Sequence, residues 1–122
     1  MWYNLYMKDN KLLQLAQEFA VDIITVTQEL KNKKEYNFAD QIKRSGTSIS
    51  ANISEGNHPQ SRADMISKFE IALKEASETE NWLTVFSNSG LISEDAFNLL
   101  HKKLVKIKII LISSIKTLKS KQ

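Results

Sequence analysis

The chain has 122 residues, a net charge of +3 at pH 7 and no cysteine. A chain of this length is expected to form one domain, which we place over residues 1–122. The lack of cysteine excludes a disulfide framework and a thiolate metal site. Apolar residues make up 42% of the chain, and only three glycines and one proline interrupt it. This composition argues against disorder and against a turn-rich β-sandwich or barrel, and it favours a few long helices.

The first predicted helix covers roughly residues 9–32. Its apolar residues recur at steps of three and four, which places them on one face that a core can bury. They are Leu12, Ala16, Phe19, Ile23, Val26 and Leu30. Three aromatic residues, Trp2, Tyr3 and Tyr6, precede this pattern. They belong either to an extension upstream of a natural start at Met7 or to an arm that docks on the protein.

The next two helices are predicted over roughly 37–56 and 61–88. Asn37 and Ser61 are expected to cap them, because an aspartate follows each of these residues three positions later. The second helix carries small and polar residues around Gly46 on its core face. Side chains of this size let another backbone approach closely.

The last helix is predicted over roughly 93–119, with Ser93 as its cap. Val105 to Ile109 alternate apolar and basic residues, a pattern that a strand also shows. The apolar stripe with helical spacing is three times as long as this alternation, so we favour a helix. Four helices with short connections predict an all-α fold, an antiparallel up-down-up-down four-helix bundle.

Charge is unevenly distributed along the chain. Residues 62–95 have a net charge of −4, whereas residues 96–122 hold seven lysines and no acidic residue. Four of these lysines are candidate contacts for the phosphates of RNA or DNA: Lys102, Lys103, Lys106 and Lys116. On a helix, the first, third and fourth of them fall within about 80° of arc. The alternatives are a solvated helix face and a docking surface for an acidic protein partner.

The first and last helices carry more apolar residues than one core stripe needs. We interpret the surplus as the interface of a homo-oligomer, since wide exposed apolar patches usually mark an interface. The candidate interface residues are Leu13, Ile24, Val105, Ile109, Ile110 and Ile112. The alternative is a broad core face with a few exposed side chains.

Glu75 and Glu78 form part of a second stripe on the third helix, between Ile71 and Trp82. Buried carboxylates need partners, so we expect a polar network that fixes the register of the helices. Its expected members are Arg44, Ser48, Asn52, Glu55, Lys74, Glu75 and Glu78. A ligand pocket, an active acid or a subunit contact are the alternatives.

Motifs for catalysis and metal binding are weak. Residues 55–58 have the Glu-x-x-His spacing of di-iron bundles, but a glycine and Pro59 end the helix there, and the spacing does not recur. Ser113 and Lys116 match Ser-x-x-Lys without the elements that accompany it in enzymes. We therefore expect no catalytic residue, no metal, no cofactor and no enzymatic activity.

Two longer motifs are more specific. Residues 40–56 read DQIKRSGTSISANISEG, with a Gln-Ile-x-Arg-Ser start and an Asn-Ile-x-Glu-Gly end, and a second block runs from Ser61 to Leu83. With the stripe of the first helix, they resemble the family of four-helix-bundle proteins encoded in 23S ribosomal RNA intervening sequences, over roughly residues 8–119. Ser77, and the pair Glu80-Asn81, depart from the pattern of a large subgroup and make the charge of that surface atypical.

The resemblance implies a four-helix bundle and a ring-like homo-oligomer, with a pentamer as the expected form. Some relatives are accessory proteins of diversity-generating retroelements, which bind nucleic acid and a reverse transcriptase. No enzymatic activity is attached to the family.

We therefore expect a cytoplasmic, non-catalytic, oligomeric protein that binds nucleic acid or serves a ribonucleoprotein as an accessory. A protein-interaction scaffold without a nucleic-acid role is the alternative. An enzyme or metal protein using Glu55, Glu75, Glu78 and His58 is a weaker one, as is membrane-surface binding by the last helix. We expect no membrane partner, because no segment approaches the ~20 apolar residues of a membrane span and the N-terminus lacks the apolar core of a secretory signal.

Overall fold

The computed structural model of the chain describes residues 10–120, and this part contains four helices and no strand. The helices are α2 (Lys11–Asn32), α3 (Tyr36–Gly56), α4 (Arg62–Asn88) and α5 (Glu94–Ser120). The all-α prediction is confirmed. Residues 105–109 lie inside α5, so the strand alternative is wrong.

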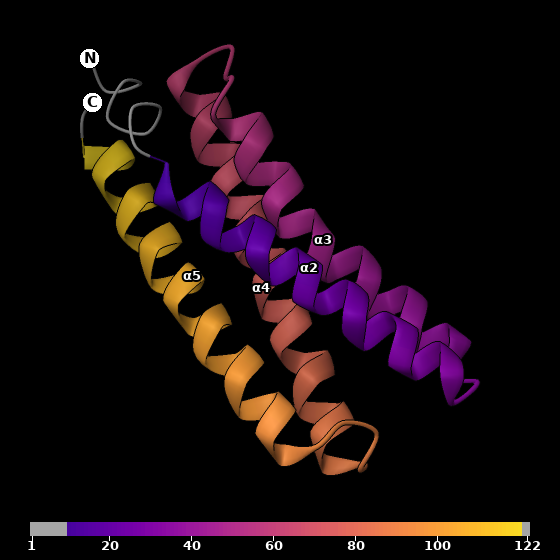
Figure 1. Cartoon of the computed structure of the whole chain (residues 1–122). Coiled ribbons are helices and arrows are strands. Elements are labelled where there is room, and N and C mark those ends of the chain that lie inside the picture. The colour runs from indigo at the N-terminus through magenta and orange to yellow at the C-terminus, as the bar shows by residue number, and fades with distance from the viewer. Residues whose placement is uncertain (1–9, 121–122) are drawn as a thin grey trace.

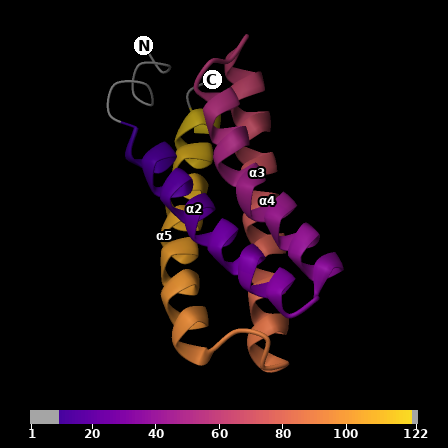
Figure 2. The same ribbon diagram turned by 45° about the vertical axis from the view of Figure 1, so that its right-hand side comes forward.

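The helices form a bundle in which each packs against its neighbours in sequence, and α2 also packs against α5. The chain reverses direction at each connection (Figure 1). The start of α2 lies beside the end of α5, and the two helices diverge as α2 runs toward α3 (Figures 1 and 2). The α2–α3 pair therefore crosses the α4–α5 pair at an angle (Figures 1 and 2).

Side-chain caps set three of the helix starts. The Asn10 side chain accepts a hydrogen bond from the Leu13 backbone at the start of α2. Ser61 and Ser93 do the same for α4 and α5, each at 3.0 Å from the nitrogen three residues later. Each cap satisfies a backbone donor that has no partner inside the helix. The predicted caps at Ser61 and Ser93 are thus confirmed.

The predicted cap at Asn37 is wrong, because α3 begins at Tyr36 and its first turn has no side-chain cap. The turn before it explains the difference. Lys34 adopts a left-handed conformation with φ of 63°, and the Glu35 backbone donates to the carbonyl of Leu30 at 2.9 Å. This bond closes α2 in the manner of a Schellman motif and starts α3 one residue earlier than the sequence pattern predicts.

Helical spacing predicts apolar stripes from Leu12 to Leu30, from Met65 to Phe86 and from Leu100 to Leu118, and these stripes of α2, α4 and α5 are all buried in one core. The small residues of α3 also act as expected, because they bring helices into close contact. A Cβ atom on Gly46 would lie 2.7 Å from Cγ2 of Ile23 in α2. A Cβ atom on Gly56 would lie 2.7 Å from Cε1 of Phe69 in α4. Both positions therefore exclude larger side chains unless the core moves.

Trp2, Tyr3 and Tyr6 lie outside the described residues, so both interpretations of the N-terminal aromatics stay open. A search of residues 10–120 for a helix with the length and hydropathy to cross a membrane finds none.

Candidate functional site

Three of the four candidate lysines lie together beside α2. They border a groove of about 310 Å³ between α2 and α5. The groove is lined by Leu15, Glu18, Leu99, Lys102, Lys103 and Lys106. A second hollow continues along the same two helices toward the start of α2, and it adds Lys11 to the basic lining. Lys11 is not among the predicted lysines, because only the fold shows that α2 borders α5.

The lysines of this α2–α5 groove differ in their partners. The ammonium of Lys103 lies 2.7 Å from a carboxylate oxygen of Asp22, so its charge is partly compensated. Lys102 and Lys106 are exposed, and neither has a carboxylate partner within residues 10–120. These two ammonium groups are therefore free to bind an anion.

Lys116 does not belong to this group. It lines a different groove, between α4 and α5, and it lies ten residues beyond Lys106, about 15 Å along the helix axis. Lys116 was predicted to join Lys102 because the two residues lie at similar angles around the helix axis. That criterion ignores which helices lie beside α5. The sequence-predicted basic stripe is therefore two separate sites.

Helix α4 neutralises part of the positive charge of α5. Glu80 accepts from Lys108 at 2.9 Å and lies 2.9 Å from Nε2 of His101. The hydrogen bond from Lys108 lowers the pKa of the Glu80 carboxyl the most, the bond from His101 lowers it further, and burial opposes both. Farther along, Glu70 pairs with Lys119 at 3.3 Å. The opposite charges of residues 62–95 and 96–122 were the sequence signal for this pairing.

The candidate interface residues fall into two groups. Ile109 and Ile112 are 61% and 49% exposed on the outer side of α5, and Ile24 is 43% exposed on α2. The others are less available. Leu13 and Ile110 pack against the core, and Val105 is half-buried. An apolar surface therefore exists on α5 and α2, although it is smaller than the sequence pattern indicates.

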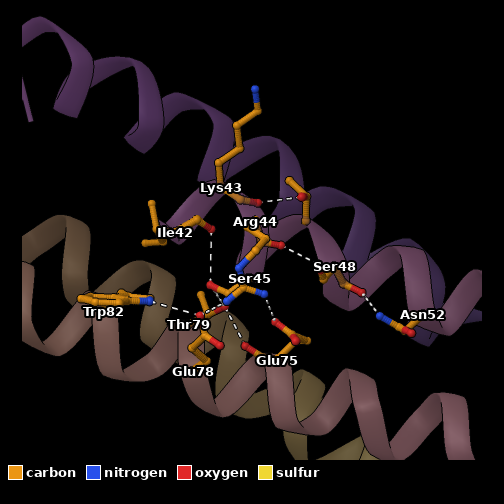
Figure 3. Close-up of polar contacts among 11 residues, drawn as sticks. Ile42, Lys43, Arg44, Ser45, Ser48, Asn52, Glu75, Glu78, Thr79 and Trp82 are labelled. Carbon is orange, nitrogen blue, oxygen red and sulfur yellow. Dashed lines mark hydrogen bonds and ion pairs between the residues drawn. The ribbon is translucent and has the colours of Figure 1, made fainter. Parts of the chain in front are cut away.

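A second cluster lies between α3 and α4, where Arg44 reaches across to two carboxylates (Figure 3). Arg44 donates to Glu75 at 3.1 Å and also to Glu78. The indole of Trp82 donates to the same Glu78 oxygen at 3.4 Å. The bond to Glu78 is the largest cause of a raised pKa for the Arg44 guanidinium, so this group stays charged. Glu75 is only 15% exposed, which makes its pairing with Arg44 important for stability.

Hydroxyl groups continue this cluster into the core (Figure 3). Oγ1 of Thr79 lies 2.9 Å from Oγ of Ser45 and 2.8 Å from the carbonyl oxygen of Glu75. Both side chains are fully buried, so they satisfy one another between α3 and α4. The arrangement resembles a structural network that fixes helix register more than a ligand site, because its carboxylates and hydroxyls already pair with other groups of the chain.

Four members of the predicted network take no part in it. Ser48 and Asn52 donate to carbonyl oxygens of their own helix, at Arg44 and Ser48 respectively, instead of to the carboxylates. Glu55 lines an open pocket at the α3–α4 turn. Lys74 is exposed beside α5 and forms no ion pair within the described part of the chain. Short side chains in a helix reach their own backbone before they reach a neighbour, which explains the first two.

The weak metal motif lies at the same α3–α4 turn. His58 and Glu55 share the open pocket with Asp64 and Lys68, but Nδ1 of His58 lies 3.2 Å from the carbonyl oxygen of Ser54. Within residues 10–120, no three histidine or carboxylate side chains are placed to hold one metal ion.

The fold and the surface define a small all-α bundle whose distinctive features are an α3–α4 seam and the grooves on both sides of α5. The family model described as 23S rRNA-intervening sequence protein matches residues 8–113. The chain belongs to this family, and the resemblance carried by the two sequence motifs is thereby confirmed.

A solved structure supports the assignment. It is the crystal structure, at 1.70 Å resolution, of a protein with unknown function from the S23 ribosomal protein family of Bacteroides thetaiotaomicron VPI-5482. The two chains are 43% identical, with a TM-score of 0.85, and the match covers 86% of this chain and 98% of that chain. The comparison with curated proteins finds no match.

Proposed function

We propose that this protein is a non-catalytic, oligomeric nucleic-acid-binding protein of the cytoplasm, which acts as an accessory of a ribonucleoprotein. The observation that carries the proposal is the pair of exposed, unpaired ammonium groups of Lys102 and Lys106 in the α2–α5 groove. Lys103 and Lys11 add positive charge at its edges. Lysines that contact phosphates bind RNA or DNA without reading the bases.

Oligomerisation is part of the proposal, because two free lysines on one subunit bind a polyanion weakly. In a closed homo-oligomer, of which a pentamer is the expected form, the same groove recurs on every subunit. Contacts to one nucleic acid then reinforce one another through avidity. The exposed side chains of Ile109, Ile112 and Ile24 are candidates for the subunit interface.

The test is fluorescence anisotropy with a labelled structured RNA and a labelled DNA duplex, titrated from about 50 to about 200 mM salt. We expect binding at low salt that weakens steeply across this range and does not depend on base sequence. The double variant Lys102→Glu/Lys106→Glu is expected to weaken binding by at least about tenfold. Lys31→Glu/Lys43→Glu is the matched control, since it makes the same charge change on exposed positions of α2 and α3.

Two results would contradict the proposal. One is no binding of either nucleic acid at the lowest salt concentration. The other is an equal loss in both double variants, which would mean that overall charge and not the groove determines the affinity.

A protein-interaction scaffold is the second candidate, and one observation favours it. Leu99 is 58% exposed inside the basic groove, and an apolar side chain contributes to a protein interface more than to a phosphate contact. Absence of nucleic-acid binding, together with one protein that co-purifies in a fixed ratio, would favour this candidate.

A further inference from the structure

The other side of α5 carries a groove that takes no part in the proposed nucleic-acid contact and that shares Ile112 with the candidate subunit interface. It has a volume of about 430 Å³ and lies between α4 and α5. Its lining residues are Glu70, Leu73, Lys74, Ser77, Ile112, Ile115, Lys116 and Lys119. On each helix, the four lining positions are spaced as i, i+3, i+4 and i+7, so each helix contributes one continuous face.

The floor of this α4–α5 groove is apolar. Ile115 is buried, and Leu73 is half-buried against the core. Ile112 is 49% exposed, so a large apolar side chain lies open at one end of the groove. Removing this surface from water would stabilise any complex that covers it.

The charges of the groove are not balanced. Glu70 and Lys119 pair with each other across one end. Lys74 and Lys116 are both exposed, and neither finds a carboxylate in the part of the chain described here. The antiparallel register that sets Glu70 beside Lys119 places Lys74 level with Ile115 and Lys116 level with Leu73. One unpaired ammonium group therefore stands on each wall, near the middle of the groove.

We propose that the α4–α5 groove binds a short amphipathic helix of a partner protein, with an apolar stripe and acidic residues on both sides of that stripe. A seam between two antiparallel helices accepts a third helix by the same packing that joins the first two. Seven residues along each wall span about 10 Å, which corresponds to about two turns of the bound helix. The acidic flanks pair with Lys74 on one wall and with Lys116 on the other.

A protein helix fits this groove better than a nucleic acid does. Its floor is formed by Leu73, Ile112 and Ile115, and a phosphate backbone gains nothing from an apolar floor. The inference does not rest on nucleic-acid binding, because the two grooves lie on opposite sides of α5 and have no residue in common.

The experiment uses the full chain and a synthetic helical probe. The probe is a fluorescein-labelled peptide of about 14 residues, with leucines at i, i+3, i+4 and i+7, glutamates on both sides of them, and a hydrocarbon staple on the far face. Two further probes replace all glutamates by glutamine or by lysine. Anisotropy titrations compare the three probes on wild type, Lys74→Glu/Lys116→Glu, Ile112→Glu and the control Lys102→Glu/Lys106→Glu.

We expect the acidic probe to bind at least about tenfold more tightly than the glutamine probe, and the lysine probe to bind least. Lys74→Glu/Lys116→Glu is expected to reverse this order, which a merely unfolded variant would not do. Ile112→Glu should weaken both the acidic and the glutamine probe. Lys102→Glu/Lys106→Glu should leave acidic-probe affinity within about twofold of wild type, since those lysines lie in the other groove.

Other outcomes would overturn the inference. They are no saturable binding of the acidic probe, an equal loss in the Lys102→Glu/Lys106→Glu control, and displacement of the probe by unlabelled RNA. One more outcome would overturn it in favour of a second copy of the chain as the occupant. If Ile112→Glu dissociates the oligomer and the wild-type protein does not bind the probe, the groove is a subunit interface.

Discussion

The α3–α4 seam and the outer surface of α5 are built in opposite ways. In the seam, small residues bring the helices together, and the polar groups satisfy one another, as in the pairs Arg44–Glu75 and Ser45–Thr79. On α5, Lys102, Lys106 and Lys116 are exposed without carboxylate partners among the described residues, and apolar side chains lie between them.

This difference separates the residues that define the family from the lysines that we propose bind nucleic acid. The two sequence motifs that carry the resemblance, residues 40–56 and 61–83, form the seam. The unpaired lysines of α5 lie outside both motifs. The two motifs thus carry mainly packing contacts, while the candidate nucleic-acid contacts Lys102 and Lys106 lie in α5. The wall of the α4–α5 groove that holds Lys74 is the exception, since it lies inside the second motif.

The largest expected effect tests the close packing of α3, at the position where Gly46 contacts α2. Gly46→Ala should lower the free energy of unfolding by about 2 kcal/mol, because overpacking a core costs about 1–3 kcal/mol and the gain in helix propensity is at most about 1 kcal/mol. The added Cβ would meet Ile23, which is fully buried. Urea denaturation measures the change, with Ser48→Ala as a control expected to be near neutral. Ile23→Ala removes Cγ1 and Cγ2, the two atoms nearest to the added Cβ. The double variant should therefore lose less stability than the sum of the two single losses, and strict additivity would contradict the close contact.

A smaller loss is expected for Arg44→Leu. This change leaves Glu75 largely buried without its partner, which we expect to cost about 1–2 kcal/mol. Lys43→Leu, at the exposed neighbouring position, should stay within about 0.5 kcal/mol of wild type. Anisotropy with RNA sharpens the comparison: folded Arg44→Leu protein should bind as wild type does, and a selective loss of binding would give the seam a functional role.

The next expected change in stability depends on pH. It concerns Glu80 of α4, which contacts His101 and Lys108 of α5. The pKa of this carboxyl is lowered mainly by the hydrogen bond from Lys108. A depressed pKa contributes stability that is present above the ordinary pKa of a glutamate and is lost as the pH falls through the value in the folded protein. Glu80→Gln should therefore cost a few tenths to about 1 kcal/mol at neutral pH. The difference from wild type should shrink as the pH falls below the ordinary pKa of a glutamate. A constant difference in denaturation curves would contradict this account.

The smallest effect on stability is expected on the outer side of α5. Ile109→Ser should change the free energy of unfolding by less than about 0.5 kcal/mol, because this side chain is 61% exposed. Sedimentation velocity should show a smaller assembly than for wild type if α5 forms the subunit interface. Val85→Ser, at an exposed position of α4, is the matched control. An unchanged assembly would remove Ile109 from the proposed interface.

Local rules predicted most of the fold. Apolar periodicity identified the buried stripes of α2, α4 and α5, and serine caps placed the starts of α4 and α5, because both depend on residues close in sequence. The start of α3 was missed because it depends on the left-handed Lys34, and lysine gives no signal for that conformation. The existence of an Arg44–Glu75–Glu78 cluster was predictable from charge and helical spacing.

The surfaces of α5 were less predictable. Which lysines are free depends on which helices lie beside α5, and this is a property of the whole bundle. Lys103 is partly compensated by Asp22 of α2, whereas Lys116 is free and belongs to another groove. The angular positions of residues around α5 cannot predict the Lys103–Asp22 pair or the separate groove of Lys116, because these positions do not say which helices lie beside α5.

The ion pairs between α5 and the other helices reduce the number of α5 lysines that remain available to contact the phosphates of a nucleic acid. Three of its lysines, Lys103, Lys108 and Lys119, already have carboxylates as counterions. Each free lysine that replaces a cation on duplex DNA adds about −0.9 to the slope of log affinity against log salt. Two free lysines in the α2–α5 groove therefore predict a slope of about −1.8 for each subunit engaged. The measured slope, divided by this increment, would report how many subunits hold one nucleic acid at the same time.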